Sequence, residues 1–80
     1  MEQQKKVRVY ATSTCPYCKM AKSFLDDNKI LYEHYDVGTD EAKRNEMIDK
    51  SGQMGVPVID IDGRIIIGFD RTAIKEALGI

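Results

Sequence analysis

Three segments in the first half of the chain show a regular spacing of apolar side chains. Apolar and polar residues alternate with a period of two over residues 7–11 (VRVYA), which predicts a β-strand. Residues 16–28 carry apolar side chains at helical spacing and predict a helix, while the tyrosine-rich residues 31–37 predict a second strand. We expect the helix to bury one face, formed by Tyr17, Met20, Ala21, Phe24, Leu25 and Asn28.

The pattern of residues 39–68 predicts a helix followed by two short strands. Thr39 is the expected N-cap of this helix, because its hydroxyl can accept a hydrogen bond from a free backbone N–H, and Gly52 is its expected end. Two apolar segments, residues 56–61 and 64–68, predict the strands. Asp62-Gly63 between them is a strong signal for a two-residue hairpin, so the two strands should run antiparallel.

A last helix is expected after Asp70, which would cap it, with Ile74, Ala77 and Leu78 facing inwards and Gly79 at its end. The element order is then β-α-β-α-β-β-α, and its first βαβ unit should be parallel and right-handed. The predicted fold is therefore α/β, with one mixed four-stranded sheet flanked by three helices that cover both of its faces.

Length and charge limit the classes of protein to which the chain can belong. Eighty residues predict one domain, spanning residues 1–80, and 12 basic against 13 acidic side chains leave a net charge of −1. We expect no nucleic-acid or membrane partner, since neither a basic excess nor an apolar run long enough to cross a bilayer is present. Residues 1–6 (MEQQKK) are polar and do not resemble a signal peptide, so we expect a cytoplasmic protein. We also expect it to be a monomer.

Both cysteines of the chain lie in one motif, Cys15-Pro16-Tyr17-Cys18, between the first predicted strand and helix. This context is typical of thioredoxin-like redox motifs. Pro16 suits the first helical position, which places Cys15 at the cap, where free N–H groups and the helix dipole stabilise a thiolate. We therefore predict Cys15 as the nucleophile and Cys18 as the resolving thiol of a thiol–disulfide exchange enzyme.

Three other interpretations of the motif have weaker support from the sequence. A static disulfide across so short a loop would remove little entropy from the unfolded chain. Cys15, Cys18 and His34 offer three soft ligands, whereas a structural zinc site needs four, although two chains could bridge an iron–sulfur cluster. A non-catalytic interaction domain would have no need of both cysteines. We therefore expect no metal and no tightly bound cofactor.

The chain resembles a glutaredoxin along nearly its full length. The resemblance rests on four features: the strand followed by TCPYC at residues 14–18, SGQMGVP at residues 51–57, the Asp62-Gly63 hairpin, and Gly68-Phe69-Asp70 at the start of the last helix. CPYC followed some forty residues later by Val-Pro at a strand start is a specific combination. The resemblance implies a thioredoxin-like fold and glutathione as the reductant of the active-site dithiol.

The resemblance also implies the residues of the site. The Val56-Pro57 peptide bond should be cis and should turn the Val56 backbone groups towards Cys15, where they could pair with an extended substrate backbone. Disulfide-containing proteins are the expected substrates. The glutathione groove should comprise Tyr17, Gln53, Val56, Pro57 and Asp70.

Two positions depart from the glutaredoxin pattern. Thr12 stands where many members have a lysine, and Arg71 stands where the family has a second acidic residue. Gly68-Phe69 is also similar to NrdH-like redoxins, which receive electrons from thioredoxin reductase and pass them to ribonucleotide reductase. The electron donor is therefore expected to be glutathione, a thioredoxin-reductase-like flavoenzyme, or both.

Overall fold

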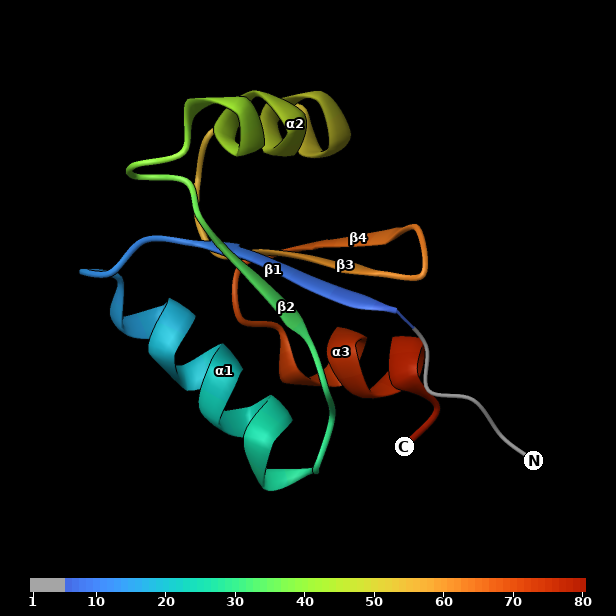
Figure 1. Ribbon diagram of the computed structural model, residues 1–80. Helices are drawn as coiled ribbons and strands as arrows, with labels where there is room; N and C mark the ends of the chain where they lie inside the picture. The colour runs from blue at the N-terminus through green and yellow to red at the C-terminus, as the bar shows by residue number, and fades with distance from the viewer. Residues whose placement is uncertain (1–5) are drawn as a thin grey trace.

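The computed structural model describes residues 6–80, and its elements follow the predicted order (Figure 1). Of the polar segment 1–6, in which we expect no signal peptide, only Lys6 belongs to the described residues. The helices and strands are β1 (Val7–Ala11), α1 (Pro16–Asp27), β2 (Glu33–Asp36), α2 (Glu41–Ser51), β3 (Val58–Ile61), β4 (Arg64–Ile67) and α3 (Arg71–Leu78).

The strands form one mixed sheet in the order β2-β1-β3-β4. β1 pairs in parallel with β2 and antiparallel with β3, and β3 pairs antiparallel with β4. α1 and α3 lie on one face of the sheet and α2 lies on the other (Figure 1). The predicted α/β fold, with a four-stranded sheet and helices on both faces, is confirmed.

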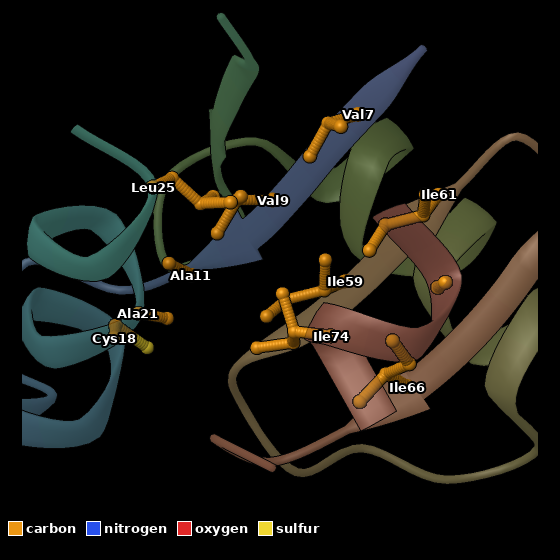
Figure 2. Close-up of a cluster of buried hydrophobic side chains, with 11 residues drawn as sticks. Val7, Val9, Ala11, Cys18, Ala21, Leu25, Ile59, Ile61, Ile66 and Ile74 are labelled. Atoms are coloured by element: carbon orange, nitrogen blue, oxygen red, sulfur yellow. The ribbon is translucent and has the colours of Figure 1, made fainter. Parts of the chain in front are cut away.

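The period of two in β1 distributes its side chains between two cores. Val7, Val9 and Ala11 point towards α1 and α3, whereas Tyr10 is fully buried on the α2 face. The larger cluster, most of which Figure 2 labels, consists of Val7, Val9, Ala11, Cys18, Ala21, Leu25, Ile59, Ile61, Ile66, Ile74 and Ala77. Because β1 is buried on both faces, packing on both sides fixes the position of the strand that leads to the CPYC motif.

The predicted hairpin is confirmed, and it needs backbone conformations that few residues adopt. Asp62 and Gly63 have φ values of 54° and 94°, so both turn residues are left-handed. This is the geometry of the tight turns that join two antiparallel strands. β3 begins at Val58 rather than at the predicted residue 56, because Pro57 has no N–H to donate to the sheet.

The N-cap of α2 differs from the prediction. Asp40, not Thr39, caps the helix: its carboxylate accepts a hydrogen bond from the Lys43 N–H at 3.0 Å. The Thr39 hydroxyl instead donates to the Asp36 carbonyl in the preceding turn. Asp and Thr both favour the N-cap position, so residue type alone did not rule out Thr39.

The buried face of α1 is narrower than predicted. Tyr17 and Met20 are 61% and 47% exposed, whereas Cys18, Ala21 and Leu25 are fully buried. The helix therefore packs on the sheet through side chains spaced three and four residues apart. The apolar residues beside this stripe remain at the surface next to the CPYC motif.

A charged network that the sequence analysis did not identify attaches α2 to the sheet. The Lys50 ammonium donates to the Asp60 carboxylate on β3 at 2.8 Å and to the Tyr10 hydroxyl at 3.1 Å. The Tyr10 hydroxyl in turn donates to Glu46. Burial raises the pKa of the Asp60 carboxyl, but hydrogen bonds from Lys50 and the Gly63 N–H outweigh it, so this pKa lies below its ordinary value.

Replacing Lys50 with methionine should lower the free energy of unfolding by about 1–3 kcal/mol, because the buried Asp60 carboxylate loses its ammonium partner. Urea unfolding followed by circular dichroism measures this loss. Since folding lowers the pKa of Asp60, its contribution is complete above about pH 4 and disappears as the pH falls through the lower folded value. In the Asp60→Asn variant, the free energy of unfolding should therefore decrease less as the pH is lowered. Equal urea midpoints for wild type and Lys50→Met would contradict this role of the network.

Candidate active site

The CPYC motif and the Val56-Pro57 segment meet at one edge of the sheet. β1 and β3 are antiparallel, with Tyr10 opposite Val58, so the residues after β1 lie beside those before β3. The Val56-Pro57 bond is cis, as predicted. The Cys15 Sγ lies 3.9 Å from the Val56 carbonyl oxygen, to which the thiol can donate. The predicted orientation of the Val56 carbonyl towards Cys15 is thus confirmed.

Cys15 occupies the N-cap of α1, and Pro16 is the first helical residue. The backbone of Cys15 is extended, with φ −88° and ψ 114°, and its sulfur accepts a hydrogen bond from the Cys18 N–H at 3.2 Å. The sulfur thus takes the place of a capping side-chain oxygen at the positive end of the helix dipole. Cys15 is half-buried, so an incoming group can reach it.

Cys18 differs from Cys15 in its burial and in its position in the helix. It is fully buried one turn inside α1, and both cysteines are free thiols in this structure. Burial, followed by the hydrogen bond and charge of Cys15, raises the pKa of Cys18 to about 11. A backbone hydrogen bond with Thr12 and the charge of Lys22 act in the opposite direction but do not prevail. Cys18 is therefore protonated and shielded at neutral pH.

The predicted groove residues differ in their freedom to contact a ligand. The Tyr17 side chain is largely exposed in the first turn of α1, beside Cys15. Asp70 caps α3 as predicted, and its carboxylate accepts a hydrogen bond from the Ala73 N–H at 3.1 Å. Pro57 is fully buried, and Val56 is half-buried against the core.

The side chain of Gln53 folds back on its own loop and bonds to the backbone of Gly55. Its amide nitrogen donates to the Gly55 carbonyl at 3.0 Å, and its amide oxygen accepts from the Gly55 N–H. A Cβ at position 55 would lie 2.6 Å from that oxygen, so glycine permits this close approach. The Gln53 amide must leave Gly55 before it can contact a ligand.

An aromatic cluster between α1 and α3 was not predicted from the sequence. The rings of Phe24 and Phe69 meet edge to face, with centroids 6.0 Å apart, and the Arg71 guanidinium lies over both. Met54, in the loop before Val56, is 70% exposed and was also not singled out. Phe69 next to a motif glycine was the available signal, but the spacing of residues 24 and 69 does not reveal their contact.

The described residues bring no three candidate metal ligands together. Among residues 6–80, no three side chains of the His, Cys, Asp or Glu type gather closely enough to hold an ion, so His34 does not join the two cysteines. Over the same residues, no helix combines the length and apolar character needed to cross a membrane.

Comparisons with known proteins agree with this geometry. The family model described as Glutaredoxin matches residues 7–66. A glutaredoxin-like 8.6 kDa protein from the rubredoxin operon of Clostridium pasteurianum is 42% identical over 72 residues, covering 90% of this chain and 96% of that protein. Glutaredoxin 3 of Escherichia coli is 38% identical over 73 residues, covering 91% of this chain and 88% of its own length.

Solved structures show the same fold. The crystal structure of the thioredoxin-like protein BC3987 superposes with a TM-score of 0.86 at 34% identity, covering 91% of this chain and all of that one. A buckwheat glutaredoxin–glutathione complex superposes with a TM-score of 0.74 at 24% identity, covering 94% of this chain and 71% of that one. The family match spans most of the chain and includes its dithiol motif. The chain therefore belongs to the glutaredoxin family of thiol–disulfide oxidoreductases.

Proposed function

We propose that the chain reduces protein disulfides and glutathione mixed disulfides, with Cys15 as the nucleophile and Cys18 as the resolving thiol. The observation that carries this proposal is the asymmetry of the two thiols. Cys15 is accessible at a helix N-cap, where its sulfur accepts a hydrogen bond from the Cys18 N–H. Cys18 is buried, and its pKa is raised to about 11. Only the accessible sulfur can make the first attack.

The reaction takes place in two exchanges. The Cys15 thiolate attacks one sulfur of the substrate disulfide, a Cys15–substrate disulfide forms, and the other substrate sulfur leaves and takes up a proton. In this mixed disulfide the hydrogen bond and the charge of Cys15 no longer raise the Cys18 pKa, whereas burial, the largest cause of the shift, still does. The Cys18 sulfur attacks Cys15, the Cys15–Cys18 disulfide forms, and the second substrate sulfur leaves as a thiol, with the proton given up by Cys18. Two electrons have passed from the dithiol to the substrate.

The proposed groove places the substrate across Val56. The Val56 carbonyl already approaches the Cys15 sulfur, so an extended substrate backbone beside Val56 would bring its disulfide to Cys15. For glutathione we assign Tyr17 to the wall of the groove, Gln53 to the glycine carboxylate and Asp70 to the γ-glutamyl amine. A neighbour of the same fold, the buckwheat glutaredoxin, has been solved with glutathione, which supports glutathione as the ligand of this groove.

We further propose that glutathione regenerates the dithiol, with no tightly bound cofactor, in a reducing compartment such as the cytoplasm. In this role the chain would contribute to electron transfer and to redox homeostasis of the cell. The alternative is an NrdH-like redoxin, reduced by a thioredoxin-reductase-like flavoenzyme and serving ribonucleotide reductase. Thr12 and Arg71 favour this alternative, because glutathione loses one cation for its carboxylate and meets a positive charge near its amine.

Turnover of a mixed disulfide with each reducing system, in separate assays, tests the donor. We expect glutathione to reduce the protein, but several-fold to thirtyfold less efficiently than it reduces a glutaredoxin with the full motif, at roughly 0.2–1 kcal/mol for each exposed charge contact. Thr12→Lys and Arg71→Asp should each raise glutathione-dependent turnover, and added salt should diminish the gain. Rapid reduction by a thioredoxin reductase, together with no turnover on glutathione, would instead assign the chain to the alternative class.

A further inference from the structure

A second groove lies between α1 and the start of α3, and none of the predicted groove residues lines it. Its volume is about 210 Å³. Two aromatic rings in edge-to-face contact, those of Phe24 and Phe69, form its apolar part, and the half-exposed Met20 adds to it. The complete lining is Met20, Ser23, Phe24, Asp27, Phe69 and Arg71.

Arg71 supplies the positive charge of this groove. Its guanidinium carbon lies 5.9 Å from the ring centroid of Phe24 and 5.8 Å from that of Phe69, so the two rings hold it in place. The side chain is exposed, and no ion pair between the described residues includes it. A guanidinium carries five N–H donors in a fixed fork that matches a carboxylate. Arg71 can therefore bind an acidic group without first breaking an ion pair.

The two carboxylates near Arg71, those of Asp70 and Asp27, still allow an acidic group of a substrate to bind there. Asp70 precedes Arg71, and its carboxylate is directed to the start of α3, where it accepts a hydrogen bond from the Ala73 N–H. Asp27 lines the groove at the last residue of α1. With a rise of 1.5 Å per residue, Asp27 lies about 18 Å along the helix from Cys15, whereas Met20 and Phe24 lie about 7.5 and 13.5 Å from it. A group over Phe24 thus binds between the dithiol and Asp27.

We propose that Arg71 is a specificity-determining residue that selects protein disulfides with an acidic side chain three or four positions from the reacting cysteine. An extended chain advances about 3.3 Å per residue, so three or four residues cover about 10–13 Å, which falls between the axial separations of Met20 and of Phe24 from Cys15. The methylene groups of the acidic side chain would pack on Phe24 and Phe69 while its carboxylate binds Arg71. This inference rests on the proposed function of Cys15 and Cys18.

Peptides with a single cysteine, activated as a mixed disulfide with pyridine-2-thiol, test the proposal without an external reductant. The reduced full-length protein attacks the peptide sulfur through Cys15, and pyridine-2-thione leaves and is measured by its absorbance. Cys18 then displaces the peptide thiol, so the protein's two thiols become its disulfide and supply both electrons. The peptides carry Glu or Gln at one, three or four positions on either side of the cysteine.

On one side of the cysteine, Glu at position three or four should react about three- to fivefold faster than Gln, whereas Glu next to the cysteine should bring no such gain. Arg71→Gln should abolish the preference, Arg71→Lys should keep only part of it, and added salt should reduce it. Asp27→Asn is the matched control and should strengthen the preference.

Equal wild-type rates for Glu and Gln peptides would overturn the proposal, as would a preference that survives Arg71→Gln. If no peptide releases pyridine-2-thione, dithiol attack itself fails, and the proposed function falls together with this inference. If all peptides react at similar rates, the proposed function stands and only the role of Arg71 is refuted. Circular dichroism of each variant verifies that it is folded.

Discussion

Replacing Cys15 with serine should abolish reduction of a protein mixed disulfide, with a loss on the order of 10³-fold or more. A serine hydroxyl is not ionised at neutral pH, and an alkoxide does not exchange with disulfides as a thiolate does. Cys18 cannot take over the attack, because it is fully buried and its pKa is raised to about 11. Single-turnover reaction of the reduced variant with a mixed disulfide measures the loss.

Cys18→Ser is the matched variant and should give the opposite result. The first attack by Cys15 remains, but no thiol stands ready to resolve the Cys15–substrate disulfide. The variant should therefore accumulate a covalent complex with a protein substrate, visible on a non-reducing gel and released by a reductant. A trapped complex with Cys15→Ser, and none with Cys18→Ser, would reverse the two roles.

The two thiols should differ more than a hundredfold in their initial rates of alkylation at pH 7. A thiol with a pKa of about 11 is ionised to roughly one part in 10⁴ at that pH, against a few per cent for a free cysteine. Burial also keeps the reagent away from Cys18. Limiting iodoacetamide should thus label Cys15, and fragmentation of the tryptic peptide 9–19 locates the label.

The control for this experiment is the unfolded chain. In concentrated urea neither the burial of Cys18 nor the helix that begins at Pro16 remains, so both thiols should react at similar rates. In the folded protein, raising the pH towards 11 should increase the share of Cys18, because its thiolate becomes populated. Preferential labelling of Cys18 in the folded protein at pH 7 would contradict the assignment of Cys15 as the accessible thiol.

The sequence predicted the features of this fold that are local in the chain. Pro16 after Cys15 predicted the helix cap, Asp62-Gly63 predicted the hairpin, and Asp70 predicted the cap of α3. In each case a residue restricts its own backbone or bonds an N–H within the same turn. The order of the elements followed from such signals together with the spacing of apolar residues.

Features that depend on distant residues could not be predicted in this way. Lys50 meets Asp60 and Tyr10 across 10 and 40 positions of the chain, and nothing in the local pattern of either residue indicates the contact. The exposure of Tyr17 depends on how much of α1 the sheet and α3 cover, which the helical period does not reveal. The cluster around Arg71 likewise exists only once α1 and α3 are packed together.

The separation of the two sheet faces has a practical consequence for labelling the protein during thiol–disulfide exchange. α2 packs on the face opposite α1, and Asn45 and Asp49 are exposed on it. A fluorophore coupled at either position would sit on the far side of the sheet from the CPYC helix and from incoming substrates. Both native cysteines lie in the CPYC motif, so the label should be attached through an unnatural amino acid rather than an added thiol. The dithiol then stays unmodified and reactive while the fluorescence is recorded.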